Sequence, residues 1–168
     1  LSRDYLWEYK EREEFAPFYA AYDILTSSSN AKNQQAFLNL FGPTTGCQAE
    51  EFRKNISSIL IAYDDGSRRR LTEDEISLFI KVASVMRLNT FEYNGGRVVF
   101  EMATRMSHSC RPNCRLAFTG QNCLCRAILP IKAGEELTIE YNCQHRLKPT
   151  HERRRAYAET KDFTCHCP

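Results

Sequence analysis

The stretch "RMSHSCRPNC", Arg105 to Cys114, gathers two cysteines, a histidine, a proline and an asparagine in one short run. Cysteine and histidine are common metal ligands. A cysteine served by an imidazole base is also an arrangement for nucleophilic catalysis. A third interpretation is a backbone knot that holds a cofactor. The rest of the chain has to decide among the three.

The nucleophile is the weakest of these interpretations. A catalytic cysteine needs its imidazole within hydrogen-bond reach, and that base usually comes from elsewhere in the fold. His108 and Cys110 are only two residues apart in what reads as a loop. From these residues alone, a packed histidine beside a small buried cysteine is the better interpretation.

A zinc site has support from the end of the chain, where "FTCHCP" contains Cys165 and Cys167. A Cys-x-Cys pair supplies half of a tetrahedral zinc site and needs further ligands. We expect this pair to bind metal because no core surrounds it. The candidates for the remaining ligands are Cys110, Cys114, Cys143 or a residue beyond Pro168.

A second Cys-x-Cys pair, Cys123 and Cys125, lies in an apolar run typical of a strand. Alternation along a strand places both side chains on one face, and free cysteine is commonly buried. We therefore expect both to be buried thiols and not metal ligands.

Composition narrows the class of protein. The 168 residues suit about one domain, and a net charge of +2 does not by itself indicate a nucleic-acid partner. No apolar run approaches the length that spans a membrane, and the charged N-terminus does not resemble a signal peptide. The eight cysteines therefore indicate thiols or zinc ligands and not disulfides. The chain opens on Leu1, which suggests a fragment.

The first half of the chain is rich in helix formers and has no glycine before Gly42. Helices are predicted over Ser2–Glu14, Pro17–Leu25 and Ala31–Leu40, and helical spacing continues from Phe52 to Tyr63. "DDGSRRR" then reads as a charged turn. Thr72 and Glu75 form a capping box that opens a further helix over "TEDEISLFIKVASVMRL".

After Arg87 the pattern changes to short strands. Two strand-like runs flank Asn94-Gly95-Gly96, which is a hairpin signal. Further short strands are separated by Gly120, Pro130 and Gly134, and "THERRRAYAETKDF" predicts a last helix. The fold class is therefore predicted to be α+β, with a helical N-terminal half followed by a β-rich half and a C-terminal helix.

The basic runs "SRRR" (Ser67–Arg70) and "ERRR" (Glu152–Arg155) are possible phosphate contacts. Each is flanked by acidic residues, and neither is interleaved with aromatic residues. Solvated loops and helix faces explain both runs adequately.

A second informative phrase, "GEELTIEY", begins at Gly134 and ends at Tyr141. Tyrosine carries a polar hydroxyl on a rigid ring, which suits a buried site that needs one placed hydroxyl. A core tyrosine at the end of a strand is the alternative.

Taken together, "SHSCRPNC" and "ILPIKAGEELTIEYN" resemble the C-terminal signature of SET-domain protein lysine methyltransferases. The tail "RRRAYAETKDFTCHCP" is similar to the post-SET segment of the SET-and-MYND (SMYD) branch. The resemblance divides the chain into a helical insertion-like segment (1–77), a C-terminal SET core (78–145) and a partial post-SET segment (146–168). It implies that the two phrases form a pseudoknot, so that the opening stretch is chiefly a backbone knot with one cysteine given to zinc.

The resemblance also implies roles for individual residues. Tyr141 matches the catalytic tyrosine beside the lysine channel. Binding of S-adenosylmethionine falls to a set of four residues: Asn89, Ser107, His108 and Phe163. Structural zinc falls to Cys110, Cys165 and Cys167, with the fourth ligand expected beyond Pro168.

Methyl transfer from a sulfonium to an amine needs a neutral lysine held in line with the methyl group. Burial in an aromatic channel lowers the lysine pKa, so no metal or acidic residue is needed at the reacting centre. We expect the chain to depart from the family pattern in four ways. The N-terminal SET strands with their Gly-x-Gly loop are missing, Ser107 replaces the usual asparagine, Lys161 replaces a common tyrosine, and the sequence stops before the last zinc ligand.

The sequence therefore predicts a fragment of a protein-lysine N-methyltransferase, acting in the nucleus or cytoplasm on a histone or other protein. We expect neither membrane binding nor direct binding to nucleic acid. Two alternatives remain. One is a SET-like binding module without turnover, favoured by Ser107 and Lys161. The other is a zinc-stabilised interaction domain that contacts nucleic acid through the arginine runs.

Overall fold

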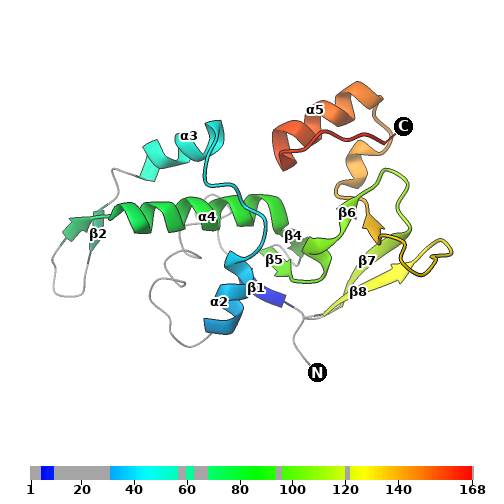
Figure 1. Ribbon diagram of the computed structural model, residues 1–168, viewed down its shortest axis with the longest axis horizontal. Coiled ribbons are helices and arrows are strands. Elements are labelled where there is room, and N and C mark those ends of the chain that lie inside the picture. The colour runs from blue at the N-terminus through cyan, green and yellow to red at the C-terminus, as the bar shows by residue number, and fades with distance from the viewer. Residues whose placement is uncertain are drawn as a thin grey trace. The chain divides into compact units, whose positions relative to one another are not determined.

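The structure is a computed structural model that describes residues 5–9, 31–56, 60–62, 68–93, 96–119 and 122–167. It mixes helices with short strands in small sheets, which confirms the α+β class (Figure 1). The chain divides into two compact units. Unit 1 contains Leu1–Glu8 and Thr90–Pro168, and unit 2 is Tyr9–Asn89. No helix in the described ranges is long and apolar enough to cross a membrane.

The described residues of unit 2 form three helices and one small hairpin. The helices are α2 (Ala31–Leu38), α3 (Cys47–Ile56) and α4 (Glu73–Asn89). The hairpin pairs β2 (Leu60–Ala62) with β3 (Arg68–Arg70) in antiparallel register. Helix α4 buries a stripe of mostly apolar residues, the pattern expected of a helix packed on a core. These are Ile76, Phe79, Ile80, Val82, Val85, Met86 and Asn89.

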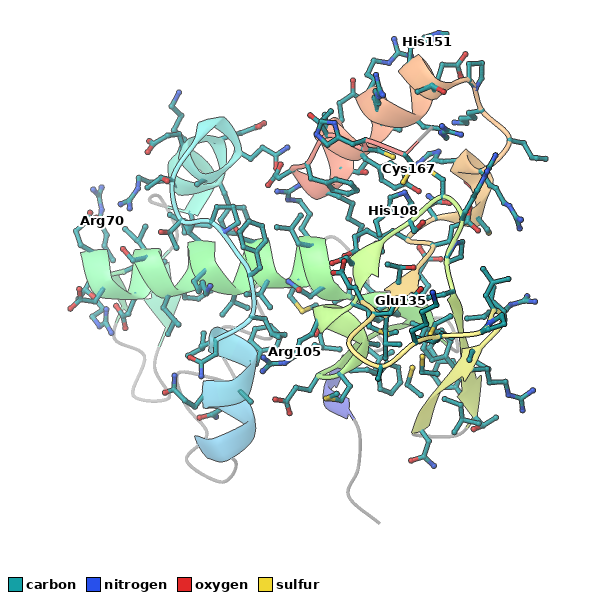
Figure 2. All side chains as sticks on the ribbon, turned by 45° about the vertical axis from the view of Figure 1, so that its right-hand side comes forward. Arg70, Arg105, His108, Glu135, His151 and Cys167 are labelled. Atoms are coloured by element: carbon teal, nitrogen blue, oxygen red, sulfur yellow. The ribbon has the colours of Figure 1, made fainter. Side chains whose placement is uncertain are left out.

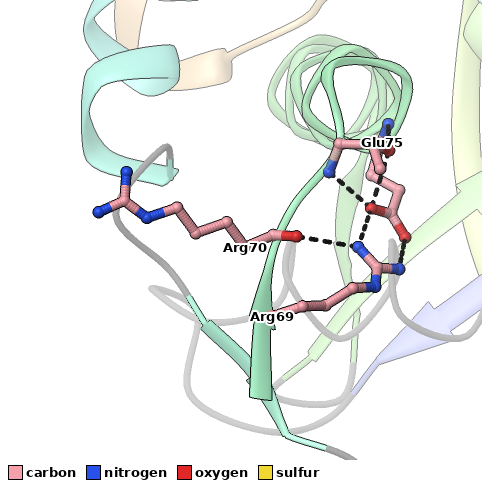
Figure 3. Close-up of polar contacts among 4 residues, drawn as sticks. Arg69, Arg70 and Glu75 are labelled. Carbon is pink, nitrogen blue, oxygen red and sulfur yellow. Dashed lines mark hydrogen bonds and ion pairs between the residues drawn. The ribbon is translucent and has the colours of Figure 1, made fainter.

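The predicted capping box opens α4 (Figure 3). The Thr72 backbone N–H donates to Glu75 Oε2 at 2.8 Å, and the Glu75 N–H donates to Thr72 Oγ1 at 3.3 Å. Arg69 adds two hydrogen bonds to the Glu75 carboxylate, both of 2.6 Å. The box thus satisfies donors at the start of the helix that have no partner within it.

Two side chains of α4 hold the loop that precedes α3. Lys81 Nζ donates to the carbonyl oxygens of Leu40 at 2.8 Å and Gly42 at 3.1 Å. Ser84 Oγ donates to the carbonyl oxygen of Pro43 at 2.7 Å. Backbone carbonyls that no strand or helix pairs are thereby satisfied by side chains. We call these contacts the carbonyl clasp.

The described residues of unit 1 form short strands, two 3₁₀ turns and one α-helix. A three-stranded sheet has the order β1 (Tyr5–Tyr9), β5 (Gly96–Phe100), β4 (Phe91–Tyr93). Two further pairs are β6 (Ser107–His108) with β9 (Thr138–Ile139), and β7 (Cys114–Thr119) with β8 (Asn122–Ala127). Short 3₁₀ turns lie at Ala103–Arg105 and Cys143–His145, and α5 (Thr150–Lys161) follows.

The hairpin predicted around Asn94 is confirmed. Strands β4 and β5 pair antiparallel, with Tyr93 opposite Gly96 and Phe91 opposite Val98. Val98 and Phe100 are buried and pack with aromatic side chains from β4 and β7. The second half of the chain therefore has the strand content that its sequence indicated.

The predicted helical N-terminal half is only partly right. Residues Tyr5–Tyr9, expected inside a helix over Ser2–Glu14, form strand β1 instead. The run "YLWEY" is rich in aromatic residues, which favour strands, and pairing with β5 outweighs the absence of helix breakers. The helix expected over Pro17–Leu25 lies outside the described residues.

Two further expectations in unit 2 are corrected. The helical spacing from Phe52 to Tyr63 holds only to Ile56, after which Leu60–Ala62 is a strand. The arginines expected in a charged turn form strand β3. In both cases cross-strand pairing, which a single helical pattern does not reveal, decides the local structure.

Candidate functional site

The two phrases singled out in the sequence lie side by side in unit 1. Strands β6 and β9 pair in parallel, with Ser107 opposite Thr138 and His108 opposite Ile139. The Ser109 N–H continues the pairing with a 2.9 Å hydrogen bond to the Ile139 carbonyl oxygen. Two segments far apart in sequence are thus brought together next to Tyr141, the contact that the predicted pseudoknot requires.

Asn113 ties the two phrases together. Its Nδ2 donates to the Glu136 carbonyl oxygen at 2.8 Å, and its Oδ1 accepts from the Thr138 N–H at 2.8 Å. Its own carbonyl oxygen accepts from the Ile128 N–H at 2.8 Å. The side chain is buried, so these partners replace water. The sequence interpretation gave Asn113 no role, although it is the one amide in the opening stretch able to donate and accept.

Tyr141 is fixed at both ends. Its hydroxyl donates to the carbonyl oxygen of Met106 at 2.7 Å, and its backbone N–H donates to His108 Nδ1 at 3.4 Å. Burial raises the pKa of the Tyr141 phenol, and the nearby Glu136 carboxylate raises it further. The phenol therefore stays protonated at neutral pH and acts as a hydrogen-bond donor.

An aromatic cluster surrounds His108. Its ring lies 4.4 Å from that of Tyr157 and 5.3 Å from that of Tyr141, centroid to centroid. Phe163 stacks on Tyr157 at 5.2 Å and meets Tyr141 edge-on at 5.9 Å. The structure therefore brings together three residues that the sequence assigned to cofactor binding and catalysis, and it adds Tyr157.

Tyr157 was missed by the sequence interpretation. It is 1% exposed, and its hydroxyl lies 3.5 Å from the carbonyl oxygen of Asn142. Burial, followed by the nearby Cys110, raises its pKa above the normal tyrosine range. Arg153 and Tyr157 lie four residues apart and are the buried residues of α5, so the helical periodicity of "THERRRAYAETK" was the available signal.

Four side chains in unit 1 form a group able to hold a metal ion: His108, Cys110, Cys165 and Cys167. One ligand atom from each lies within 4.8 Å of all the others. Cys110 Sγ is 3.6 Å from Cys165 Sγ and 3.3 Å from His108 Nε2. Figure 2 labels His108 and Cys167. We call this group the thiol cluster.

The donor set and spacing of the thiol cluster fit zinc. Three sulfurs and one imidazole nitrogen form a Cys₃His set, which is usual for structural zinc. Zn–S bonds of about 2.3 Å in a tetrahedron place sulfurs about 3.8 Å apart, close to the observed distance between Cys110 and Cys165. The Cys110 N–H also donates to Cys167 Sγ at 3.3 Å, and Arg154 Nε donates to the Cys165 carbonyl oxygen at 2.9 Å.

The acidities within the cluster differ. Burial, followed by hydrogen bonding to Cys165, raises the pKa of Cys110 to about 12. Burial also opposes ionisation of Cys167, but hydrogen bonds from the Cys110 N–H and neighbouring thiols outweigh it and lower the pKa of that thiol. Burial lowers the pKa of His108, which favours the neutral imidazole. Metal binding would therefore have to displace the proton of the Cys110 thiol.

The structure agrees with the predicted zinc ligands only in part. Cys110, Cys165 and Cys167 come together as expected. His108 joins them as a fourth donor, whereas the sequence assigned it to the cofactor and placed the fourth ligand beyond Pro168.

The other cysteine candidates lie elsewhere. Cys114 packs in a core cluster with Met106 and Ile139, and Cys143 is exposed. Cys123 and Cys125 are not part of the group of described residues that could hold a metal ion. Cys125, however, is exposed and Cys123 only half-buried, so the prediction that both are buried is wrong.

Two remaining site predictions concern Ser107 and Asn89. The Ser107 hydroxyl donates to the Glu136 carboxylate, so a Ser–Glu pair stands where the family pattern has an asparagine. Asn89 is the last residue of α4 in unit 2 and donates to the carbonyl oxygens of Phe41 at 2.7 Å and Val85 at 2.9 Å. Its cofactor role stays a prediction.

Lys161, the other departure from the family pattern, lies at the end of α5. Its Nζ is 6.0 Å from the centroid of the Tyr141 ring, on the ring face. That distance is at the outer limit of a cation–π contact. A cation therefore stands beside the tyrosine that the sequence marks as catalytic.

Comparison with known proteins agrees with the resemblance. A family model described as the SET domain matches residues 7–142, most of the chain and well beyond the stretch over which the motifs were recognised. The histone-lysine N-methyltransferase SMYD3 of Mus musculus is 44% identical over 62 residues. The N-lysine methyltransferase SMYD2 of Homo sapiens is 35% identical over 72 residues, and a putative SET domain-containing protein L678 of Acanthamoeba polyphaga mimivirus is 27% identical over 154 residues.

These alignments cover limited parts of the relatives. The SMYD3 match takes in 37% of this chain and 14% of that protein, and the SMYD2 match 43% and 16%. The viral protein is matched over 89% of this chain and 58% of its own length. The chain thus corresponds to a small part of the SMYD proteins and to a little over half of the viral one.

Proposed function

The chain belongs to the SET-domain family and is SMYD-like, and we propose that it forms part of a protein-lysine N-methyltransferase. The proposed reaction moves the methyl group of S-adenosylmethionine to a lysine of a histone or other protein, in the nucleus or cytoplasm. One observation carries the proposal: the protonated Tyr141 hydroxyl is held on the Met106 carbonyl oxygen, beside His108 and Phe163.

The residues present suit S-adenosylmethionine. Phe163 and Tyr141 offer aromatic surface for an adenine ring or a sulfonium methyl group. Ser107 and Glu136 offer a hydroxyl and a carboxylate, and the negative charge of Glu136 complements a cationic cofactor. When bound, the cofactor supplies an electrophilic methyl group. We assign adenine stacking to Phe163 and polar contacts to the β6 strand, with Asn89 as a further proposed contact.

Tyr141 has the central role in the proposed mechanism. Its hydroxyl and the Met106 carbonyl oxygen orient the lysine amine, which must be neutral to attack. Burial beside Tyr141 would remove water from a lysine ammonium ion and so favour loss of its proton to solvent. The fixed hydroxyl needs no rearrangement during the reaction, which keeps the amine aligned with the transferring methyl group.

We propose that the thiol cluster binds structural zinc. Cys110 lies in the knot stretch just after β6, and Cys165 and Cys167 follow Phe163, so a metal here would fix Phe163 against the β6 strand. His108 is the fourth donor offered within the described residues. Binding through His108 would fix its ring, while its backbone remains free for the cofactor.

The test is transfer of tritium from labelled S-adenosylmethionine to a mixture of histones and cell proteins. It should use this chain and a version extended at both ends. Transfer that falls at least a hundredfold in Tyr141→Phe, with the fold retained by circular dichroism, supports the proposal. Equal transfer by Tyr141→Phe would exclude Tyr141 as the catalytic residue.

A binding module without turnover is the second candidate, because Lys161 places a cation on the face of Tyr141. That charge would compete with a substrate lysine. Binding of S-adenosylmethionine without methyl transfer, reversed by Lys161→Tyr, would favour this candidate.

A further inference from the structure

The β7–β8 hairpin has two faces of different character. Leu116, Phe118 and Cys123 pack against the core cluster of Val98 and Phe100. Because side chains alternate along a strand, the residues between them point to the opposite face. We call this the outer face of the hairpin; it consists of the cross-strand pairs Arg115–Arg126, Ala117–Leu124 and Thr119–Asn122.

The pair Arg115–Arg126 is unusual. The two residues are directly opposite each other in the register and are exposed. Like charges in that position lie about 5 Å apart at Cβ and destabilise the pairing. In the part of the chain that the structure describes, neither guanidinium has a hydrogen bond or an ion pair. Among the described residues, no acidic side chain pairs with either arginine to offset this unfavourable contact.

The sequence around the hairpin is rich in positive charge. Between Glu101 and Glu135 the chain has no aspartate or glutamate, yet it contains Arg105, Arg111 and Lys132 besides the outer-face pair. Of these, Arg105 is paired, with Glu101 at 3.1 Å. The local charge is thus strongly positive although the whole chain is nearly neutral, and it would attract acidic groups at moderate ionic strength.

Two more features indicate what kind of partner fits. Leu124 is 43% exposed and lies next to the arginine pair on the same face. Strand β8 pairs with β7 along one edge, and its other edge has no strand partner among the described residues. An open strand edge can take up an extended peptide through backbone hydrogen bonds, with specificity from alternate side chains.

We propose that the outer face of the β7–β8 hairpin binds an acidic protein segment in extended conformation, added along the free edge of β8. In such a strand, a carboxylate would face Arg126 and an apolar side chain two residues away would face Leu124. The partner's carboxylate relieves the repulsion between the arginines. Nucleic acid fits less well, because the outer face has no aromatic residue on which bases could stack.

The binding test uses a fluorescein-labelled peptide of repeated Glu-Thr-Leu-Thr and the same peptide with lysine in place of glutamate. We expect only the acidic peptide to raise the polarisation, and Arg126→Glu to weaken binding about tenfold or more. Arg155→Glu is the matched control, because Arg155 is an exposed arginine of α5 and the change in net charge is identical. It should alter the affinity less than twofold.

Thermal unfolding supplies a second measurement. Arg126→Glu replaces repulsion across the hairpin by attraction to Arg115, so the unfolding temperature should stay level or rise while the peptide affinity falls. That combination excludes simple misfolding as the cause of lost binding.

Three results would overturn the proposal. One is no binding of the acidic peptide by the folded chain. Another is a loss of peptide binding in Arg155→Glu as large as that in Arg126→Glu, which would indicate that the peptide responds only to the net charge of the protein. The third is tighter binding of a short duplex DNA than of the acidic peptide, lost in Arg126→Glu, which would assign the face to nucleic acid.

Discussion

The carbonyl clasp of unit 2 and the thiol cluster of unit 1 both join segments that are distant in sequence, but they satisfy their polar atoms differently. In the clasp, Lys81 and Ser84 donate to backbone carbonyls at ordinary hydrogen-bond distances. In the cluster, Cys110 and Cys165 have only weak sulfur contacts with each other. A region whose polar groups all have hydrogen bonds within the protein has a structural role. A group of metal-ligating side chains with only weak contacts to one another instead indicates that a metal ion binds there.

The largest predicted effect is loss of zinc from the thiol cluster, which has no counterpart in the carbonyl clasp. Cys165→Ser should abolish zinc retention and lower the unfolding temperature by about 6–12 °C, equivalent to about 3 kcal/mol, because a structural metal contributes directly to folding. Metal content is measured by mass spectrometry after dialysis. Cys125→Ser is the control, since that thiol is exposed and outside the cluster. Equal zinc content in both variants would contradict a metal-binding cluster.

A change in unit 2 should destabilise without touching the metal. A Cβ on Gly42 would lie 2.7 Å from Val85 Cγ2 and 2.9 Å from the Val85 backbone nitrogen. Gly42→Ala should therefore reduce the free energy of unfolding by about 1–3 kcal/mol, measured in urea, with zinc content unchanged. Phe41→Ala, at a side chain that is 67% exposed, should change it by less than about 0.5 kcal/mol. A Gly42→Ala protein as stable as its parent would show that the loop does not approach α4 so closely.

Tyr157 tests whether the aromatic cluster positions the cofactor residues. Tyr157→Leu removes the ring that lies against His108 and Phe163, and should cost about 1–2 kcal/mol of stability and weaken S-adenosylmethionine binding about fivefold. Tyr157→Phe keeps the ring and should restore the cofactor affinity. If Tyr157→Phe binds as weakly as Tyr157→Leu, the hydroxyl contact with Asn142 matters more than stacking.

The smallest effect concerns the capping box at the start of α4. Hydrogen bonds from Arg69 and then Thr72 lower the pKa of Glu75 from 4.5 to about 2. The stabilisation is therefore complete above pH 4.5 and is lost as the pH falls towards 2. Arg69 is 40% exposed, so solvent screening reduces the contribution to about 1 kcal/mol.

Glu75→Gln should show this loss at pH 7 and a flatter stability profile between pH 4.5 and 2, followed by urea unfolding at each pH. An unchanged profile in Glu75→Gln would mean that other carboxylates control acid unfolding.

The sequence correctly predicted the elements that depend on interactions between residues close together in the chain. Thr72 and Glu75 predicted the start of α4, and Asn94 predicted the turn between β4 and β5. The strand at Tyr5–Tyr9 was missed because its cause is pairing with β5, which is distant in sequence. Short strands of this kind depend on partners more than on propensity.

The candidate site shows the same division. Motifs named Tyr141, Phe163 and the three cysteines, and the structure places them together. Tyr157 carries no motif, because its role comes from the face that α5 buries. The approach of His108 to Cys110 likewise depends on side-chain placement that spacing along the chain does not specify.

Calorimetric titration of S-adenosylmethionine into this chain, and into a version extended at both ends, tests the central claim most directly. Phe163→Ala and Phe41→Ala serve as a matched pair, since each removes one phenyl ring from a different unit. We predict binding by at least the extended protein, weakened about tenfold by Phe163→Ala and unchanged by Phe41→Ala. Failure of both folded proteins to bind, or equal losses in the two variants, would contradict a methyltransferase site around Tyr141.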